Sequence, residues 1–285
     1  MNGRELLAAA VRQLSDAGVD SPRVDAELLL AHVLGLSRAA LLTLGDIASA
    51  EVDRFDALVG QRADRVPLQH LTGVAAFRYL ELAVGPGVFV PRPETEQLAG
   101  WALERLAGTS APVVVDLGSG TGALALSIAF EHPGARVTAV ERDPGAIEWT
   151  RHNAATRAAA GDTPVEVLAG DMTDAGLLPD LDGAVDLVVS NPPYVPDGAR
   201  VPREVADHDP PLALWGGPDG LDVVRGLLVT AARLLRPGAW LGVEHADQQG
   251  RALPALVRAS GGWVDVEDHP DLAGRPRFTT ARRAG

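Results

Sequence analysis

The fold of this chain is decided by the stretch Val113-Val114-Val115-Asp116-Leu117-Gly118-Ser119-Gly120-Thr121-Gly122. Its first half is apolar and mostly β-branched, which is typical of a strand buried on both faces, and the glycines after it predict a tight turn. A helix is then expected from Ala123 to Glu131. Glycines at such a turn let the backbone approach a ligand closely and expose N–H groups at a helix start. Many cofactor-binding folds share this turn.

The alternation of strand and helix continues along the chain. Apolar runs at residues 136–140, 165–168 and 185–190 predict three further strands, separated by helical segments. Such alternation indicates a parallel sheet covered on both faces by helices.

Three acidic residues are expected at one edge of this sheet. Asp116, Glu141 and Asp171 each lie at or near the end of a predicted strand, and ligands bind beyond the carboxyl ends of such strands. Glu141 follows the glycines by about twenty residues, the spacing at which a carboxylate hydrogen-bonds a ribose diol. The three acids together predict a nucleoside-containing cofactor.

The strand at 185–190 leads into Asn191-Pro192-Pro193-Tyr194. Each proline lacks an N–H, fixes its own φ near about −65° and pushes the preceding residue towards extended geometry. The Asn191 side chain and the Pro192 carbonyl are therefore predicted to be oriented acceptors beside an aromatic ring. Two such acceptors could grip both N–H donors of a planar –NH2 group and aim its nitrogen at an electrophile. The alternative is a plain Asn-Pro turn after a strand.

The C-terminal third predicts the remaining elements of the sheet. Residues 197–218 are irregular and proline-rich, and could form a substrate-facing loop. A pair of strands after the last helix suggests an antiparallel edge, so we expect a doubly wound, mostly parallel, seven-stranded α/β sheet. The expected elements are helices at 221–235 and 252–259 and strands at 239–244, 263–266 and 277–280.

The N-terminal part has a different pattern. Residues 2–65 predict a bundle of short helices, with caps at Asn2, Ser37 and Ser49 and a start at Ser21-Pro22. No catalytic grouping is visible in it.

Between the bundle and the sheet, residues 77–84 and 88–90 alternate around Gly85-Pro86-Gly87, which predicts a β-hairpin. Pro91-Arg92-Pro93-Glu94-Thr95-Glu96 predicts a stiff entry into a helix that runs to about Ala107. The expected domains are thus a helical bundle at 1–73, a hairpin linker at 74–92 and a cofactor-binding domain at 93–285.

Composition limits the classes of function. The formal net charge is −13, and all 25 basic residues are arginine, which argues against a nucleic-acid groove because it repels polyphosphate. No apolar run approaches the roughly 18 residues of a membrane span. The N-terminus lacks the layout of a secretory signal, so we expect a cytoplasmic protein. There is no cysteine, the histidines lack metal-ligand spacing, and no metal is expected.

With these motifs, the sequence resembles the class I S-adenosylmethionine-dependent methyltransferases, and more narrowly the release-factor glutamine methyltransferases. The glycine turn and Glu141 match the general class. Asn-Pro-Pro-Tyr narrows the resemblance to enzymes that methylate an amino or amide nitrogen on a planar group. The most specific similarities are Asp25-Ala26-Glu27-Leu28-Leu29-Leu30-Ala31-His32, Pro67-Leu68-Gln69-His70-Leu71-Thr72-Gly73 and Pro91-Arg92-Pro93-Glu94-Thr95-Glu96.

The resemblance implies a cofactor, S-adenosyl-L-methionine, which becomes S-adenosyl-L-homocysteine, and a protein substrate. The family methylates the glutamine of the Gly-Gly-Gln tripeptide in bacterial class I peptide chain release factors, and the bundle would help to grip that protein. No membrane or direct nucleic-acid partner is implied, and a monomer is expected. The implied cofactor residues are Asp116, Gly118, Ser119, Gly120, Thr121, Gly122, Glu141, Asp171, Met172 and Asn191. The implied substrate residues are Arg92, Glu94, Asn191, Pro192, Pro193 and Tyr194, of which Asn191, Pro192 and Tyr194 would be catalytic.

The chain departs from the family pattern at three places. Glu141 stands where members often carry Asp, Met172 where many have an aromatic residue, and Asp209-Pro210 where Glu-Pro is usual. None of these changes removes a group needed for methyl transfer.

Two alternative functions remain open from the sequence. A nucleic-acid adenine N6-methyltransferase would use the same Asn-Pro-Pro-Tyr loop on an exocyclic amine, but it would have to flip a base and neutralise phosphates. A non-catalytic cofactor-binding adaptor is the second alternative.

Overall fold

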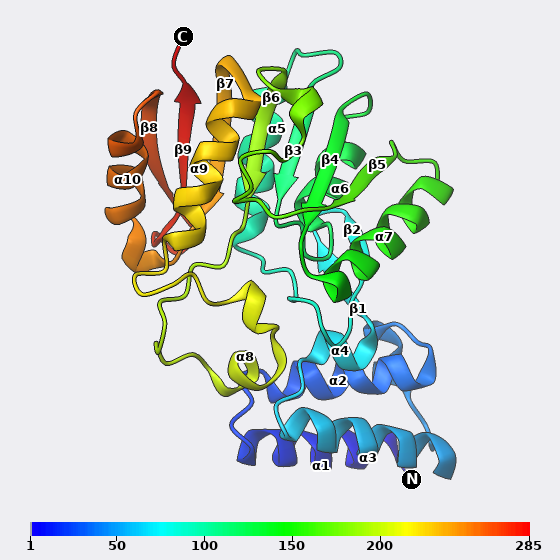
Figure 1. The fold of residues 1–285 in the computed structure, drawn as a ribbon. Coiled ribbons are helices and arrows are strands. Elements are labelled where there is room, and N and C mark those ends of the chain that lie inside the picture. The colour runs from blue at the N-terminus through cyan, green and yellow to red at the C-terminus, as the bar shows by residue number, and fades with distance from the viewer. Residues whose placement is uncertain (1) are drawn as a thin grey trace. The chain divides into compact units, whose positions relative to one another are not determined.

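A computed structural model describes residues 2–285 and contains a seven-stranded sheet in the order β5-β4-β3-β6-β7-β9-β8 (Figure 1). The first five strands in this order are parallel, and β9 is antiparallel to both β7 and β8. The doubly wound, mostly parallel sheet with an antiparallel edge is confirmed. The strands are β3 (Val113–Leu117), β4 (Arg136–Glu141), β5 (Val165–Ala169), β6 (Val185–Ser190), β7 (Leu235–Glu244), β8 (Trp263–Pro270) and β9 (Pro276–Arg283).

The central strands are buried on both faces, as their unbroken apolar runs predict. Successive side chains alternate between the faces: Val114 and Leu187 pack in one core cluster, and Val115, Leu117 and Val188 pack in the other. The first cluster includes residues of α5 (Thr95–Leu106), α6 (Ala123–Glu131) and α7 (Pro144–Ala159), and the second includes residues of α9 (Asp222–Leu234) and α10 (Ala252–Ser260). Helices therefore cover both faces of the sheet.

The order of the strands creates a position for a ligand. From β3 the chain proceeds outward through β4 and β5, and it then returns to place β6 and β7 on the other side of β3. The connections leave β3 and β6 in opposite directions, so a crevice is expected beyond their carboxyl ends. Gly118 follows β3 at this point and Asn191 follows β6.

The predicted hairpin is present, but its predicted position was wrong. Its strands are β1 (Val74–Phe77) and β2 (Leu80–Ala83), and the turn falls at Arg78-Tyr79 rather than at Gly85-Pro86-Gly87. Arg78 has φ +51°, an unfavourable backbone conformation for a residue with a Cβ. Its N–H donates to Glu96 at 3.0 Å, and its guanidinium binds Glu131 through two nitrogens. These partners, distant in sequence, hold the turn.

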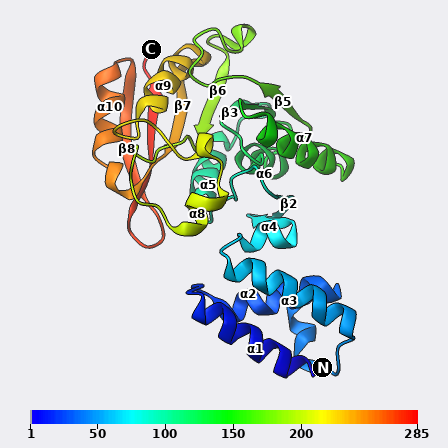
Figure 2. The same cartoon turned by 60° about the horizontal axis from the view of Figure 1, so that its bottom comes forward.

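The N-terminal helices form a compact unit of their own, which comprises the residues up to Val74 together with Val84–Pro86 and Val201–His208. In both ribbon views α1 (Gly3–Asp16), α2 (Pro22–Leu34) and α3 (Ser49–Ala63) lie side by side (Figure 2). Leu14, Leu29 and Phe55 are fully buried between them. The unit also contains the shorter η1 (Arg38–Thr43), α4 (Leu68–Thr72) and α8 (Arg203–His208).

Most of the predicted helix starts in this unit are confirmed, and one is wrong. The Asn2 side chain accepts a hydrogen bond from the Arg4 N–H at 2.9 Å and so caps α1. Pro22 begins α2, and Gly35 ends it in the left-handed conformation. Ser49, however, is the first residue of α3 and Ala48 is its cap. The Glu51 side chain bonds the Ala48 N–H at 3.3 Å, which supports the helix start without a capping hydroxyl.

A buried charge cluster links α8 to the bundle unit. The Arg62 guanidinium donates to Asp25 and to Glu204, each at 2.7 Å, and to the Val66 carbonyl at 2.9 Å. Buried ion pairs of this kind are tolerated when further hydrogen bonds support them, as the Val66 carbonyl does here. The irregular segment predicted at 197–218 thus contains a short helix, followed by a 3-10 turn at Pro211–Ala213.

Among residues 2–285 no helix has the length and apolar character needed to cross a bilayer.

Candidate active site

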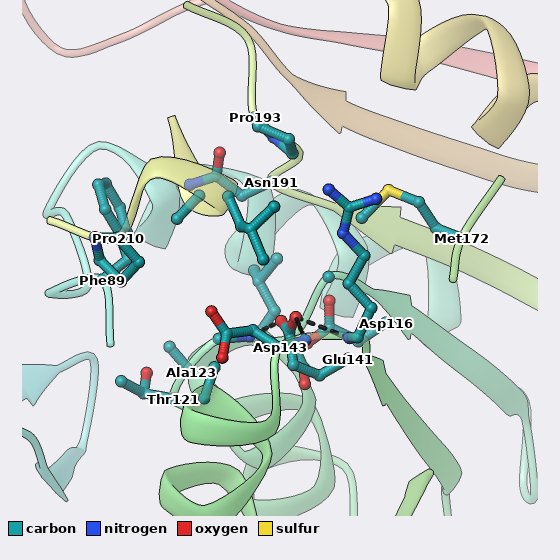
Figure 3. Close-up of a pocket in the computed structure, with 18 of the residues that line it drawn as sticks. Phe89, Asp116, Thr121, Ala123, Glu141, Asp143, Met172, Asn191, Pro193 and Pro210 are labelled. Atoms are coloured by element: carbon teal, nitrogen blue, oxygen red, sulfur yellow. Dashed lines mark hydrogen bonds between the residues drawn. The ribbon is translucent and has the colours of Figure 1, made fainter. Parts of the chain in front are cut away.

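A pocket lies beyond the carboxyl ends of β3, β4 and β6, within the unit that contains the sheet. Asn191 and Pro193 lie across it from Glu141 and Asp143 (Figure 3). Most of the residues predicted for the site line this one pocket. They are Arg92, Asp116, Gly118, Ser119, Gly120, Thr121, Glu141, Asp171, Met172, Asn191, Pro193 and Tyr194.

Three predicted residues do not line the pocket. Pro192 is buried between Asn191 and Pro193, which do line it. Gly122 begins α6, and a Cβ there would lie 3.0 Å from Leu126 and 3.2 Å from Thr150, so this glycine serves the packing of the turn. Glu94 precedes α5 and does not line the pocket itself, although its charge acts on the hydroxyl of Tyr194, which does.

The glycine turn shapes the pocket through the conformation of its backbone, and not through N–H groups that are free to bind a ligand. Gly118, Gly120 and Gly122 all have positive φ, a region that side chains rarely occupy. A Cβ on Gly118 would lie 2.5 Å from the Met172 methyl group, so a side chain there would have to displace that methyl group as well as adopt a strained φ of +81°. The expectation of exposed N–H groups was wrong for most of the turn. The bonded N–H groups are those of Gly118 and Ser119 to the Val140 carbonyl, Gly120 to Glu141 and Gly122 to the Ser119 carbonyl.

Glu141 binds the backbone on both sides of the pocket floor. Its Oε2 accepts the Gly120 N–H at 2.9 Å, and its Oε1 accepts the N–H groups of Arg142 at 2.8 Å and Asp143 at 2.9 Å. A carboxylate oxygen can accept two hydrogen bonds, so Oε2 keeps one lone pair for a ligand. This carboxylate therefore ties β4 to the glycine turn and still offers an acceptor to a hydroxyl group.

Asp116 is the most deeply buried ionisable group of the pocket. It is fully buried in β3; its Oδ2 accepts the Ala125 N–H at 3.1 Å, and its Oδ1 has no hydrogen-bond partner among the described residues. Burial raises the pKa of Asp116 to about 7, against the lowering effect of the Ala125 N–H. An unpaired buried oxygen is costly, and a cationic or N–H group of a bound ligand would satisfy it.

Asp171 and Met172 form another wall. The Asp171 carboxylate accepts the N–H and hydroxyl of Thr173 and pairs with Arg142 at 3.0 Å. Partial burial would raise the pKa of Asp171, but these bonds outweigh it and lower the pKa. The Met172 side chain is buried against the glycine turn, and a thioether there can make soft contacts with an aromatic ring system.

The Asn191 carboxamide faces the pocket from the opposite side. Its Nδ2 donates to the Thr95 hydroxyl at 3.2 Å, so its Oδ1, the other polar atom of the same planar group, remains as an acceptor. Tyr194 also lines the pocket, and burial raises the pKa of its hydroxyl, with a further contribution from the neighbouring Glu244 charge. The loop thus combines a fixed acceptor with a neutral aromatic ring.

The loop that carries Asn191 is supported by a glycine-rich segment. Gln249 Nε2 donates to the Tyr194 carbonyl at 3.1 Å and to the Asp219 carbonyl at 3.2 Å. A Cβ on Gly220 would lie 2.2 Å from the Tyr194 carbonyl oxygen, and one on Gly216 would lie 2.6 Å from the Pro193 carbonyl oxygen. Close backbone packing therefore restricts the position of the loop.

Several contacts and lining residues of the pocket were not predicted from the sequence. Arg92 stacks over the Phe89 ring at 4.6 Å and pairs with buried Asp209 at 2.7 Å. Thr95 lies in the family motif at residues 91–96 but was not among the residues predicted for the site, and nothing local marks its contact with Asn191. Others that were missed are Phe77, Arg142, Asp143, Pro210, Leu212 and Val223.

Two family models match the chain. Residues 5–73 match the PrmC N-terminal domain, and residues 81–207 match the methyltransferase small domain. Among solved structures, the hMettl16 catalytic domain in complex with an RNA hairpin has a TM-score of 0.55 at 16% identity, over 85% of this chain and 84% of that one. The 16S rRNA methyltransferase RsmC of T. thermophilus has a TM-score of 0.52 at 23% identity, over 74% of this chain and 49% of that one. These two share the fold.

Much closer relatives exist among curated proteins. The release factor glutamine methyltransferases of Mycolicibacterium smegmatis and Streptomyces coelicolor are each 52% identical to this chain, over 98% of it and 97% of their own length. That of Deinococcus radiodurans is 45% identical over the full length of both chains. With this identity from end to end, and with the pocket described above, the chain belongs to the release factor glutamine methyltransferase family.

Proposed function

We propose that this protein methylates the side-chain amide nitrogen of the glutamine in the Gly-Gly-Gln tripeptide of bacterial class I release factors. The observation that carries the proposal is the Asn191 carboxamide, which turns its Nδ2 towards Thr95 and leaves Oδ1 to accept an N–H in the pocket. Relatives over the whole length are release factor glutamine methyltransferases, so the substrate amide is that of a glutamine.

The cofactor is S-adenosyl-L-methionine, and the pocket has suitable groups for it. The free Oδ1 of Asp116 suits an ammonium group, the remaining lone pair of Glu141 Oε2 suits a ribose hydroxyl, and Met172 suits the adenine ring. When bound, it supplies an electrophilic sulfonium methyl, whose transfer to an amide nitrogen leaves S-adenosyl-L-homocysteine and a proton.

Positioning supplies most of the catalysis in this proposal. An amide nitrogen is a poor nucleophile because its lone pair is delocalised into the carbonyl, and alignment of reactants contributes up to roughly 7–11 kcal/mol in favourable cases. Asn191 Oδ1 would hold one N–H of the glutamine, and more strongly as positive charge develops on the nitrogen, which stabilises the transition state. The Pro192 carbonyl would accept the other N–H, and Pro193 and Tyr194 would line the amide.

The substrate assignment also defines the setting of the protein. Release factors act in translation, so the proposal places this protein in the cytoplasm, where it works as a monomer without contacting nucleic acid directly. The helical bundle would bind the release factor outside its Gly-Gly-Gln loop.

The decisive experiment uses labelled S-adenosyl-L-methionine and a class I release factor. We expect label on the factor, and none on a factor whose Gly-Gly-Gln glutamine is replaced by alanine. Label that persists on the replaced factor would refute the substrate assignment. An adenine N6-methyltransferase is the competing function, and retention on heparin at low salt together with transfer to adenine-containing DNA or RNA would favour it over ours. Because a net charge of −13 repels phosphate and sulfate groups, we expect neither retention on heparin nor methyl transfer to nucleic acid.

A further inference from the structure

The side chain of Gln249 joins three separate segments of the backbone, although it does not line the pocket. Gln249 ends the short 3-10 turn η4 (Asp247–Gln249) and is 6% exposed. Its Oε1 accepts the Ala246 N–H at 3.0 Å, and its Nε2 donates to the Tyr194 carbonyl at 3.1 Å and to the Asp219 carbonyl at 3.2 Å. The proposed reaction assigns no part to this residue.

These three bonds fix the direction of the Gln249 carboxamide. A backbone N–H only donates and a carbonyl oxygen only accepts, so the amide oxygen must face Ala246 and the amide nitrogen must face the two carbonyls. A half-turn of the amide would break all three bonds and set its oxygen against two carbonyl oxygens. Since the side chain has one favourable orientation, it acts as a fixed crosslink between the three segments.

The crosslink holds the peptide group between Tyr194 and Val195 from one side, and a second bond holds it from the other. The carbonyl oxygen of this peptide accepts from Gln249 at 3.1 Å, and its N–H donates to the Leu214 carbonyl at 2.8 Å. A peptide group is planar, so bonds to both its oxygen and its N–H fix its orientation. Leu214 lines the pocket, so this peptide ties the Asn-Pro-Pro-Tyr loop to another part of the pocket wall.

The two prolines of the loop transmit this position to Asn191. Pro192 and Pro193 have no N–H and a fixed φ, so the loop has few backbone donors of its own and little freedom to absorb a shift. A displaced Tyr194 carbonyl would therefore move the other end of the loop. The acceptors that the proposed reaction needs, the Asn191 side chain and the Pro192 carbonyl, lie at that end.

Gly220 provides the space in which the crosslink forms. A Cβ at this position would lie 2.2 Å from the Tyr194 carbonyl oxygen and 2.6 Å from Gln249 Nε2. Donor and acceptor of the same hydrogen bond thus occupy the volume that a side chain at residue 220 would need. The close approach of these segments depends on glycine there, in addition to its positive φ.

The turn that carries Gln249 is itself anchored to the sheet. His245, which is fully buried, comes just before it. The His245 N–H donates to the Arg277 carbonyl on β9 at 2.9 Å, and its ring Nε2 bonds the Asp268 carboxylate on β8 at 2.8 Å. The crosslink therefore connects the Asn-Pro-Pro-Tyr loop to the antiparallel edge of the sheet, which is a rigid base.

We propose that Gln249 is a positioning residue for methyl transfer, which holds the Asn-Pro-Pro-Tyr loop so that Asn191 Oδ1 and the Pro192 carbonyl face the glutamine amide. This role rests on the function proposed above. Gln249 would touch neither substrate nor cofactor, so its loss should impair the alignment of the reactants and leave the binding of S-adenosyl-L-homocysteine nearly unchanged.

The first test compares the turnover of two variants with saturating cofactor and the Gly-Gly-Gln release factor. Gln249→Met keeps the length of the side chain and removes all three bonds. Gln249→Glu keeps an acceptor for the Ala246 N–H but turns an oxygen towards the two carbonyls, so it isolates the effect of the loop bond. We expect both variants to lower kcat by roughly 10- to 100-fold, the scale of a misplaced catalytic group, with less than about a threefold change in the Kd of S-adenosyl-L-homocysteine.

Gln248 offers a matched control one position earlier. Its side chain is exposed on the same turn, so Gln248→Met should leave kcat unchanged. Thermal unfolding of each variant sets an assay temperature at which it is folded. If Gln249→Met and Gln249→Glu retain the wild-type kcat, the positioning role is wrong. It is also wrong if the affinity for S-adenosyl-L-homocysteine falls as far as kcat does, because that result marks a general disruption of the pocket.

A second measurement detects the bond without any substrate. The chain has two tyrosines, and of these Tyr194 alone precedes a valine. Tyrosine labelled with ¹³C at the carbonyl and valine labelled with ¹⁵N therefore leave a single correlation in a carbonyl–amide NMR spectrum, that of the peptide between Tyr194 and Val195. Loss of the hydrogen bond should move its ¹³C signal upfield in Gln249→Met and not in Gln248→Met. An unchanged signal in Gln249→Met would overturn the inference.

Failure of the proposed function gives a different result from failure of the positioning role. If the ¹³C signal moves as expected but the wild-type protein does not methylate the release factor, the proposed function fails and the Gln249 contact stands. If the wild type methylates the factor and Gln249→Met does so equally fast, the positioning role alone fails.

Discussion

Glu141 is one side chain that holds the pocket together and is also expected to bind the cofactor. Each of its oxygens accepts backbone N–H groups, and only Oε2 has a lone pair to spare. Glu141→Gln replaces one oxygen by a donor that cannot accept these bonds. Loss of a hydrogen bond to a charged group costs about 1.5–3 kcal/mol, so we expect S-adenosyl-L-homocysteine to bind roughly 10- to 100-fold more weakly in calorimetry.

The control for this variant lies seven positions further along the chain, on the exposed side of α7. Glu148→Gln makes the same chemical change away from the pocket and should leave the affinity unaltered. Equal affinities for both variants would mean that Glu141 does not reach the ligand.

The raised pKa of Asp116 makes stability depend on pH in a specific direction. An unfolded Asp titrates near about 3.9, whereas burial raises the pKa of Asp116 in the folded protein to about 7. Between these values the folded state keeps a proton that the unfolded state has lost, so this residue removes stability as pH rises from about 4 to about 7, by roughly 1.4 kcal/mol per pKa unit.

Asp116→Asn removes this titration while other groups, Glu244 included, remain in both proteins. The free energy of unfolding of the variant relative to wild type should therefore increase from about pH 4 to about pH 7 and stay level above it. Urea unfolding of both proteins without cofactor measures this difference. A difference that is constant with pH would show that Asp116 titrates normally.

At the scale of elements, the Asn191 loop depends on the glycine segment packed beneath it. Gly220 has φ +74°, and a Cβ there would lie 2.2 Å from the Tyr194 carbonyl oxygen. Gly220→Ala must therefore displace the loop, and we expect a loss of about 1–3 kcal/mol of stability, the usual cost of strain or overpacking. Methyl transfer should fall by roughly tenfold or more, because misplaced groups align poorly.

Gly198 provides a matched comparison in the same connection between β6 and α9. It has φ +75°, but a Cβ there meets nothing within 4 Å. Because its φ is equally unfavourable for alanine, Gly198→Ala should lose stability in thermal unfolding through a similar backbone strain. It should keep full methyl transfer. If both variants lose activity equally, the loop contact of Gly220 is not the cause.

At the scale of the whole molecule, the net charge of −13 affects how fast the protein associates with its partners. Arginine is its only basic residue type. If a basic patch of the release factor meets this acidic protein, salt should weaken their encounter, since the Debye length falls from about 30 Å at 0.01 M to about 8 Å at 0.15 M. We expect the association rate constant to drop by about tenfold or more over this range. Rates that are flat with salt would exclude electrostatic attraction.

Local sequence determined most of the regular elements, and twelve of the residues predicted for the site line the pocket. An apolar β-branched run such as Val113–Leu117 is a strand wherever it is buried, and the glycines after it must turn, because both preferences depend on the residues themselves. Strand ends in a parallel sheet meet at one edge, so Asp116, Glu141 and Asn191 could be placed together without coordinates.

Tertiary structure decided the features whose cause lies far along the chain. The hairpin turns at Arg78 rather than at a glycine because Glu96 and Glu131 hold that residue. The Asn191 amide donates to the Thr95 hydroxyl although 96 positions separate the two residues. Contacts between distant segments leave no local pattern, since any polar residue at a helix start or a strand end looks the same until the chain brings its partner.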